Sequence, residues 1–415
     1  MIGTDMSDQE IVLSSDQEEV FAQTLGWVDS HNPLLRFGGL AGTGKTTLLA
    51  ALAKHVTIQK SVAFCALTGR AASVLANKLA QQGMVTGTNV DAQEHYCGTI
   101  HGLLYTPKYN KKTGELLGWS KRQFLSHQLI VVDEASMVPR EIFEDLKRLG
   151  VPILAVGDHG QLAPVGGHDF NLMDNPDIRL EKIHRQAENN PIIQLAAEVR
   201  RSGMIDPQLA DGTHVRVVSS DGVGPHLQRL FRQPAENVLD TAVLCYTNRT
   251  RVEINKRARA LRFGYTGVPE WPVRDDVVVC LRNLHDYGIY NGFRGFYTNE
   301  PRPASTHWVK GTIDFPLESR QLTENVSRYH FMRSYPIREF SDLAPFCPRS
   351  WKEVGPLFDY GYGLTVHKAQ GSQFSDVVLF SERPRKVDPD EYKRWLYTAV
   401  TRASERLVVV RPART

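Results

Sequence analysis

One short stretch constrains this chain more than any other, the sequence GLAGTGKT at residues 39–46. A short apolar run at 34–37 precedes it, and a helical pattern over 46–56 follows it. Glycines let backbone N–H groups close around phosphates, and the start of a helix adds the positive end of its dipole. The spacing therefore predicts a phosphate-binding loop between a strand and a helix.

Each side chain of this loop has an expected task. Lys45 is expected to reach the β- and γ-phosphates of ATP, and Thr46 to bind Mg²⁺. The other loop residues predicted to contact the nucleotide are Gly39, Gly42, Thr43, Gly44 and Thr47. The alternative is a glycine-rich turn without a ligand, which the joint presence of strand, lysine and threonine disfavours.

A second apolar run, at 129–132, ends in the adjacent carboxylates Asp133 and Glu134, followed by Ala135 and Ser136. Ligands of open α/β sheets bind at the carboxyl ends of the strands. Asp133 is therefore predicted to associate with Mg²⁺, and Glu134 to orient the attacking water as a base. Two solvated acids in a turn are the alternative.

Short apolar runs alternate with helical patterns along most of the chain, which predicts an α/β fold with parallel sheets. In the first half of the chain, helical patterns at 46–56 and 70–80 lie between apolar runs at 34–37, 61–67, 129–132 and 153–156. Similar apolar runs occur again at 242–246, 377–380 and 407–410. Two α/β units are expected. A β-hairpin is predicted at 105–119, and a small β-rich insertion in a segment rich in proline, glycine and aromatic residues.

Composition narrows the function classes. The 49 basic and 46 acidic residues give a net charge of only +3, so a polyanion must be held by a local groove and not by the charge of the whole chain. The five cysteines contain no CxxC pair, which argues against a zinc site and favours reduced thiols. Without an apolar leader or a run of about 18 apolar residues, the expected location is a bacterial or phage-infected cytosol, with no membrane association.

A third motif, GDHGQLAPV at 157–165, places Gln161 where it can sense a γ-phosphate. With the phosphate loop and the DEAS sequence, it resembles superfamily-one helicases of the five-prime-to-three-prime group, RecD-like and Dda-like. The resemblance implies two RecA-like parallel-sheet P-loop motor domains, with a β-hairpin insertion and a small β-rich SH3-like insertion. It implies a first motor domain at 1–180, with a pin hairpin inserted at 100–122. The second motor domain would comprise 181–265 and 355–415, around an accessory domain at 266–354.

The resemblance also assigns residues to nucleotide chemistry. Gln17 would contact the adenine, and Gln370 and Gly371 would contact the nucleotide from the later motif TVHKAQG. Arg185 and Arg402 would be arginine fingers that stabilise the charge of the transferred phosphoryl group across the cleft. The sequence departs from many relatives at Gln373, where they carry a glutamate that could contact the ribose.

Further motifs imply contacts with single-stranded DNA. The residues assigned to them are Thr68, His101, Thr247, Asn248, Thr365 and His367. The hairpin at 105–119 would act as a wedge, with Lys108, Lys111 and Lys112 facing phosphates. An ordinary loop that packs Trp119 into the core is the alternative.

Together these motifs imply an ATP-dependent DNA helicase with Mg²⁺ as cofactor, functional as a monomer in replication, recombination or repair. Its implied partners are single-stranded DNA, junctions with duplex DNA, and a single-strand-binding protein or replisome components. Two alternatives stay open: a translocase that displaces bound proteins with little unwinding, and an ATP-gated module that binds single strands. RNA is the weaker track, because Ser136 follows the DEA triplet where RNA-directed relatives usually carry glutamine.

Overall fold

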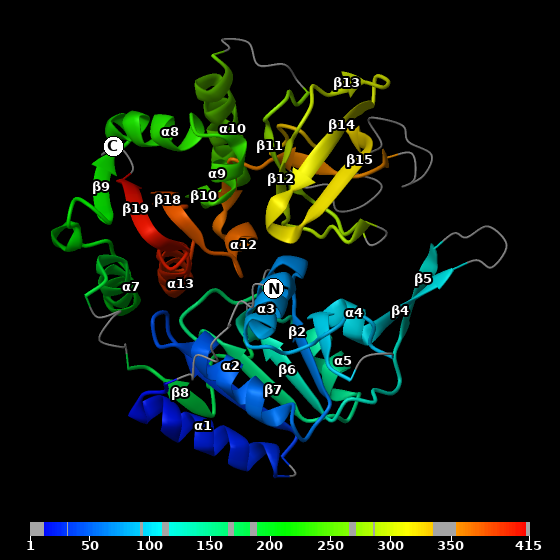
Figure 1. The fold of residues 1–415 in the computed structure, drawn as a ribbon. Coiled ribbons are helices and arrows are strands. Elements are labelled where there is room, and N and C mark those ends of the chain that lie inside the picture. Colours follow the sequence, from blue (N-terminus) through cyan, green and yellow to red (C-terminus); the bar gives the residue numbers. More distant parts are fainter. Residues whose placement is uncertain are drawn as a thin grey trace, which may run out of the picture. The chain divides into compact units, whose positions relative to one another are not determined.

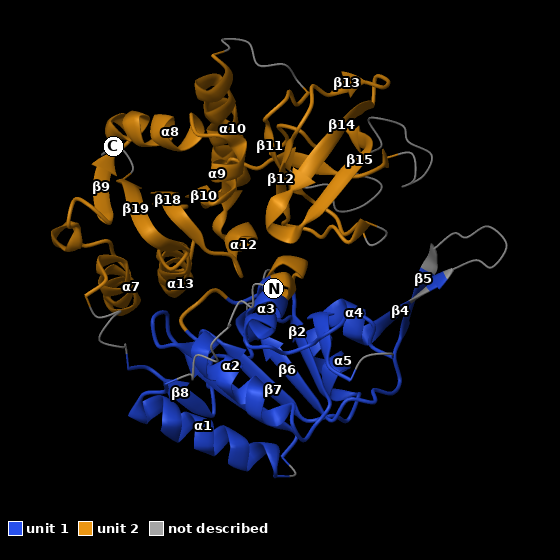
Figure 2. Cartoon of the chain, in the orientation of Figure 1, with its two compact units in different colours: residues 1–67, 74–159, 163–187 blue, residues 68–73, 160–162, 188–415 orange. Residues whose placement is uncertain are grey.

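The computed structural model describes residues 12–30, 32–91, 94–109, 116–164, 170–182, 189–264, 271–284, 287–334 and 354–411. Contacts between residues in space divide the chain into two compact units (Figure 2). Unit 1 comprises residues 1–67, 74–159 and 163–187. Unit 2 comprises residues 188–415 together with two short segments, 68–73 and 160–162. The finer domain boundaries expected from the sequence stay predictions.

Unit 1 is built on a parallel sheet of six strands in the order β3-β2-β6-β7-β1-β8. The strands are β1 (Leu34–Gly39), β2 (Val62–Ala66), β3 (Tyr96–Thr99), β6 (Leu129–Asp133), β7 (Ile153–Gly157) and β8 (Ile178–Leu180). The helices are α1 (Ser15–Val28), α2 (Lys45–Val56), α3 (Gly69–Gln81), α4 (Ile100–Leu104) and α5 (Arg140–Lys147), with a 3₁₀ turn η1 (Ala135–Met137).

Strand β2 shows why the runs of this sheet are apolar throughout. Val62 and Phe64 enter one core with side chains of α1 and α2, whereas Ala63 and Cys65 enter a second core with side chains of α4 and α5. Successive side chains of a strand point to opposite faces, and a parallel sheet is covered on both. Both faces are therefore buried, and an alternating pattern is not expected.

The predicted hairpin is present as an antiparallel pair of strands, β4 (Tyr105–Tyr109) and β5 (Leu116–Lys121). In Figure 1 the pair projects away from the sheet of unit 1, next to α4. The side chain of Trp119 is 46% exposed, so it does not fill the core. Residues 110–115, which include Lys111 and Lys112, lie outside the described part of the chain.

Unit 2 contains a second parallel sheet, in the order β17-β10-β18-β19-β9. Its strands are β9 (Val215–Ser219), β10 (Thr241–Cys245), β17 (Gly363–Thr365), β18 (Phe374–Phe380) and β19 (Ala403–Arg411). The helices of the unit are α7 (Pro191–Ser202), α8 (Gly224–Phe231), α9 (Ala235–Leu239), α10 (Asn248–Phe263), α12 (Val366–Ala369) and α13 (Pro389–Val400), with 3₁₀ turns η2 (Pro207–Leu209) and η3 (Asp221–Val223).

An antiparallel sheet follows the helix α10, in the order β13-β14-β12-β11-β16, with β15 paired to β14. Its strands are β11 (Val277–Cys280), β12 (Arg294–Tyr297), β13 (Arg302–Pro303), β14 (Trp308–Phe315), β15 (Arg320–Ser327) and β16 (Phe358–Tyr360), with a 3₁₀ turn η5 (Pro316–Glu318). Its apolar side chains and those of β10 and β18 belong to one hydrophobic core. The region is thus β-rich as predicted, and its SH3-like character stays a prediction.

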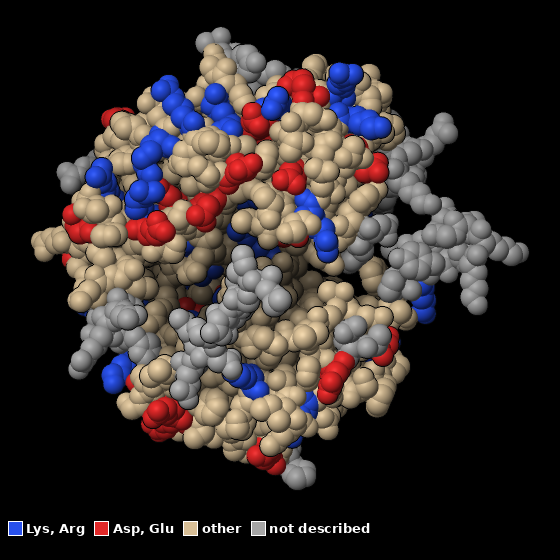
Figure 3. Space-filling view, viewed as in Figure 1, with Lys and Arg blue, Asp and Glu red and all other residues tan. Residues whose placement is uncertain are grey.

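The strands and helices expected from the apolar periodicity are confirmed, and their ends move by a few residues at most. Within the described part of the chain, no helix has the length and apolarity needed to cross a membrane. On the face shown in Figure 3, basic side chains lie among acidic ones, in line with the near balance of charges in the sequence.

Candidate nucleotide-binding and nucleic-acid-binding residues

The loop between β1 and α2 has the backbone that its glycines predict. Gly42 and Gly44 have φ angles of 79° and 78°, in the left-handed region that favours glycine. A Cβ atom on Gly39 would lie 2.5 Å from Cγ of Lys45, so the loop closes on its own lysine. Helix α2 begins at Lys45, and its first N–H groups are available to an anion.

Lys45 is held by two oxygens of unit 1. Its Nζ donates a hydrogen bond to the carbonyl of Leu40 at 2.9 Å and lies 3.8 Å from a carboxylate oxygen of Asp158. Asp158 is buried, so it keeps the ammonium group at the mouth of the loop. Asp158 belongs to the motif around Gln161, but sequence reasoning gave it no role.

The two carboxylates at the end of β6 differ in their surroundings. Burial, and next the charge of Glu134, raise the pKa of Asp133 to about 6. Glu134 has a φ of 52°, a strained angle for a residue with a side chain, and its N–H donates to Oδ1 of Asp133 at 2.9 Å. Strain of this kind is often found at functional sites.

The residues assigned to Mg²⁺ offer the ligands that this ion prefers, a carboxylate and a hydroxyl oxygen. Asp133 stands at the end of β6, and Thr46 is in the first turn of α2. Nζ of Lys78, on α3, donates to Oγ1 of Thr46 at 3.3 Å. Its charge also opposes the rise in the pKa of Asp133. The ammonium group of Lys78 thus occupies a position where positive charge is favoured by both residues, so the residues fit Mg²⁺.

Gln17 is buried and both ends of its amide are engaged by unit 1. Its Nε2 donates to the carbonyl of Thr43 in the phosphate loop at 3.2 Å, and its Oε1 accepts from the N–H of Ser14 at 3.0 Å. The second bond is half of a capping box at the start of α1. Gln17 therefore supports the loop here, and its contact with a base stays a prediction.

Arg402 lies in unit 2 between α13 and β19, with only 4% of the residue exposed. Its guanidinium donates to the carbonyls of Thr398 and Ser372 at 3.1 and 3.0 Å, and to the hydroxyl of Thr401 at 3.2 Å. These acceptors are uncharged, so they fix the orientation of the guanidinium without cancelling its charge.

The segment 160–162, grouped with unit 2, is tied to two later motifs through the backbone of Leu162. Its N–H donates to the hydroxyl of Thr398 at 3.0 Å, and its carbonyl accepts from Nε2 of Gln370 at 3.3 Å. Gln161 is buried beside it. These bonds connect three of the predicted motifs, and the spacing of the sequence did not reveal them.

The residues predicted to contact DNA share one topological position, the junction where a parallel strand passes into a helix. Thr68 and His101 follow β2 and β3. In unit 2, Thr247 and Asn248 follow β10, whereas Thr365 and His367 end β17 and begin α12. Thr68 and Thr247 accept from N–H groups three residues ahead, and burial lowers the pKa of His367.

Two results bear on the completeness of the predicted site. Arg185 lies in the segment 183–188, outside the described residues, so its role stays a prediction. Lys78 was missed because it stands 32 residues from Thr46, on another helix, with no motif to mark it.

Two sequence families match this chain. The family described as AAA domain matches residues 12–220, half of the chain, and the UvrD-like helicase C-terminal domain matches residues 360–410. The first match contains the phosphate loop, Asp133 and Glu134, and the second contains Arg402.

Curated relatives match over nearly all of this chain. RecBCD enzyme subunit RecD of Mycobacterium tuberculosis is 25% identical over 417 residues, which cover 90% of this chain and 65% of that protein. The ATP-dependent RecD2 DNA helicase of Deinococcus radiodurans is 26% identical over 435 residues, covering 95% and 48%. The chain thus spans between about half and just under two thirds of the length of these relatives.

Solved structures of Pif1 helicases share the fold. One, of two coordinating Pif1 helicases at forked double-stranded DNA, has a TM-score of 0.54 at 19% identity and covers 96% of this chain and 92% of that chain. The Bacteroides Pif1 helicase in complex with ADP-AlF3 and single-stranded DNA has a TM-score of 0.52 at 17% identity, with the same coverage. The two parallel sheets are those of two RecA-like motor domains. The chain belongs to the AAA domain family, and over most of its length it is similar to RecD and Pif1 helicases.

Proposed function

We propose that this chain is an ATP-dependent DNA helicase that moves along single-stranded DNA in the five-prime-to-three-prime direction. The observation that carries the proposal is the grouping in unit 1 of a phosphate loop with Lys45, the hydroxyl of Thr46 and the carboxylates at the end of β6. The names of RecD2 and Pif1, both helicases, support DNA as the nucleic acid that is bound and ATP as the nucleotide that is hydrolysed.

The chemistry is hydrolysis of ATP to ADP and phosphate. Glu134 orients the attacking water, Lys45 neutralises the β- and γ-phosphates, and Arg402 supplies charge to the transferred group. Thr46 and Asp133 would hold Mg²⁺, which supplies further charge neutralisation at the phosphates. Arg185 is proposed as a second arginine finger, and Gln161 as the sensor of the γ-phosphate.

Single-stranded DNA is proposed to lie along the strand ends that carry Thr68, His101, Thr247, Thr365 and His367, with Asn248 beside them. Hydroxyl, amide and imidazole groups bind phosphates without reading sequence, as a motor on any strand requires. A single-strand-binding protein or a replisome component is a proposed partner. The buried thiols of Cys65, Cys97, Cys245 and Cys280 suit a reducing cytosol.

The hairpin β4–β5 is proposed to separate the strands. Opening one base-pair step costs about 1.4 kcal/mol of stacking on average. Stacking of a freed base on one aromatic side chain returns about 1–3 kcal/mol. Trp119 presents an exposed ring and Lys108 an exposed charge for this task.

The experiment that tests the function compares Lys45→Ala and Glu134→Gln with Lys54→Ala, a change to an exposed lysine on the same helix as Lys45. ATP turnover on single-stranded DNA and unwinding of duplexes tailed on either end are measured. We expect Lys45→Ala to abolish turnover while DNA binding survives, Glu134→Gln to bind ATP but hydrolyse it very slowly, and the control to match the unaltered protein. Turnover without unwinding would indicate a translocase, and no turnover in the unaltered protein an ATP-gated binding module.

A further inference from the structure

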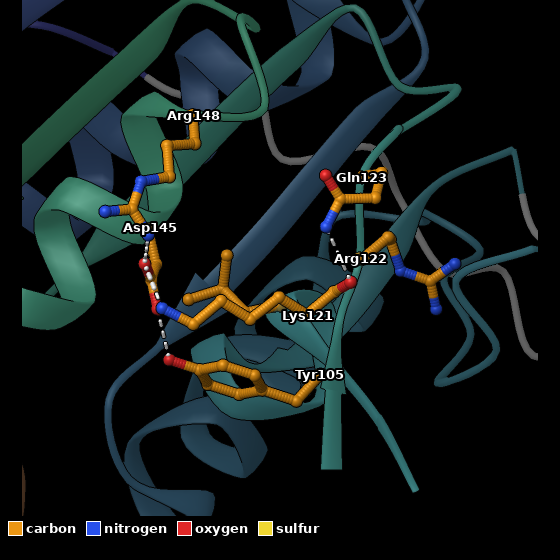
Figure 4. Close-up of a pocket in the computed structure, with 7 residues that line it drawn as sticks. Tyr105, Lys121, Arg122, Gln123, Asp145 and Arg148 are labelled. Carbon is orange, nitrogen blue, oxygen red and sulfur yellow. Dashed lines mark hydrogen bonds and ion pairs between the residues drawn. The ribbon is translucent and has the colours of Figure 1, made fainter. Parts of the chain in front are cut away.

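A cavity of about 180 Å³ lies at the base of the hairpin, and residues of the hairpin and of helix α5 line it together. Figure 4 shows the side chains of Tyr105, Lys121, Asp145 and Arg148 around this space. Because a cavity lies there, apolar packing alone does not set the angle at which the two strands leave unit 1. The orientation of the hairpin must therefore also depend on the polar contacts across this space, whereas close packing fixes orientation elsewhere.

A single carboxylate makes these contacts. Oδ2 of Asp145, on α5, accepts from the hydroxyl of Tyr105 at 2.7 Å, and its Oδ1 accepts from Nζ of Lys121 at 2.8 Å. Tyr105 begins β4 and Lys121 ends β5, so the carboxylate holds both strands of the hairpin at their base. Arg148, which caps the end of α5, donates to the same Oδ1 at 2.7 Å and fixes the carboxylate from the same segment.

Because the carboxylate of Asp145 is buried, its contacts should hold the hairpin more firmly than an ion pair on the surface would. Lys121 and Arg148 have side chains that are 53% and 67% exposed, and pairs between exposed groups contribute little. The side chain of Asp145 is only 8% exposed, and three donors converge on it. The hydrogen bond from Lys121 is the largest cause that lowers the pKa of Asp145, so the group stays ionised at neutral pH.

The cluster also adjoins a residue predicted to contact DNA. The ring of His101, on α4, lies 5.5 Å from the ring of Tyr105, centre to centre. The ring of Tyr105 packs against the core formed with α4 and α5 while its hydroxyl binds Asp145. A shift of the hairpin base would therefore move a neighbour of this proposed DNA contact.

We propose that Asp145 is a positioning residue, which holds β4 and β5 at the angle that strand separation requires. The bonds of its carboxylate go to Tyr105, Lys121 and Arg148, none of which is predicted to contact nucleotide, so we expect it to act through the hairpin. The proposal rests on the proposed function, because it assigns the anchored hairpin to unwinding. An error of about 1 Å in the placement of a working group can cost on the order of 100-fold in rate. A loosened base should therefore reduce unwinding more than any other activity.

The first test compares Asp145→Asn with Glu144→Gln. Glu144 lies on the same helix and forms an ion pair along its surface with Lys147 at 2.8 Å. For Asp145→Asn we expect the unwinding rate to fall roughly tenfold or more, while ATP turnover on single-stranded DNA stays within about twofold. Glu144→Gln should leave both unchanged. Asp145→Glu, which restores the carboxylate, should recover most of the unwinding, and Tyr105→Phe, which removes one donor, should give an intermediate loss.

The second test measures the hairpin itself, with no reference to unwinding. A nitroxide label on Lys108→Cys, in a Cys347→Ser background, reports the motion of β4, because the other four cysteines are buried. We expect Asp145→Asn to narrow the spectral lines of the label, and Glu144→Gln to leave them unchanged.

The outcomes separate the anchor from the proposed function. Faster motion of the label together with a selective loss of unwinding supports the proposal. An equal loss of unwinding and turnover, or a label that moves as before, overturns it. Faster motion with normal unwinding overturns it as well, because the angle would then not matter. If the unaltered protein fails to unwind DNA, the proposed function fails, while the label still reports whether Asp145 holds the hairpin.

Discussion

Two buried arginines of unit 2 have opposite surroundings. Arg259, on α10, is fully buried, and its guanidinium donates to both carboxylate oxygens of Asp276 at 2.9–3.1 Å. Arg402, 4% exposed, donates to two carbonyls and a hydroxyl. Among the described residues, no carboxylate lies within 4.0 Å of Arg402. The first charge is neutralised in place, and the second is oriented but not neutralised.

The difference indicates what each arginine is for. A buried ion pair such as Arg259 with Asp276 costs much to break but adds little net stability, so its role is structural. A buried cation held by neutral oxygens keeps its attraction for an anion. Since arginine stays charged in proteins, that attraction is always present. Arg402 is therefore the better candidate for contact with the transferred phosphate, as its motif implies.

The largest expected effect comes from Arg402→Gln. The amide can replace one of the hydrogen bonds but carries no charge, so turnover of ATP should fall about 1,000-fold or more. The midpoint of urea unfolding should move little by comparison. Turnover on single-stranded DNA, binding of a fluorescent ATP analogue and unfolding are measured together. If turnover persists, Arg402 is not an arginine finger, whatever its surroundings.

The reverse pattern is expected for Arg259→Gln. This change leaves Asp276 buried without its cation, which should cost about 3–5 kcal/mol in the free energy of unfolding. Turnover per folded molecule should stay near that of the unaltered protein at a temperature where the variant is folded. A large loss of turnover without a loss of stability would remove the distinction between the two arginines.

A smaller effect is expected for Thr398→Val, which probes the surroundings of Arg402. The hydroxyl of Thr398 accepts from the N–H of Leu162, and a buried N–H left without a partner costs about 1–3 kcal/mol. Unfolding should therefore shift by that amount. Thr398→Ser keeps the hydroxyl and should shift much less. A larger shift for Thr398→Ser than for Thr398→Val would mean that the methyl group, and not the hydrogen bond, matters at this position.

The smallest expected effect concerns Glu318, a half-buried acid whose charge is disfavoured by burial more than it is favoured by the charges of Arg70 and Arg294. Burial raises the pKa of Glu318 to about 7 from its ordinary 4.5, and its Oε2 has no hydrogen-bond partner in the described part of the chain. The folded chain thus binds this proton more tightly than the unfolded chain. Stability from this group is present below pH 4.5 and is lost as the pH rises towards 7.

Glu318→Gln should flatten this dependence. The difference in pKa corresponds to about 1–2 kcal/mol after allowance for partial exposure. Thermal unfolding at several pH values between 4.5 and 7 measures it, with Glu324→Gln on β15 as the control. A slope that is the same in Glu318→Gln and in the unaltered protein would contradict the expected titration.

The sequence alone determined the features that depend on neighbours along the chain. The phosphate loop, the strand ends at Asp133 and the alternation of strands and helices all follow from local spacing, because glycine geometry and apolar periodicity act within a few residues. The hairpin at 105–119 could be predicted for the same reason, because its signal is also local. The assignments of Arg185, Arg402 and the residues proposed to contact DNA came from motif order, and they remain proposals.

Tertiary structure alone decided which groups meet through space. Lys78 reaches Thr46 from another helix, Gln17 supports the phosphate loop from α1, and Leu162 bonds to Thr398 across 236 residues. The contact of Asp145 with both strands of the hairpin is of the same kind. No local pattern marks such pairs, because a hydrogen bond depends on distance and direction between atoms, and those exist only once the chain has folded.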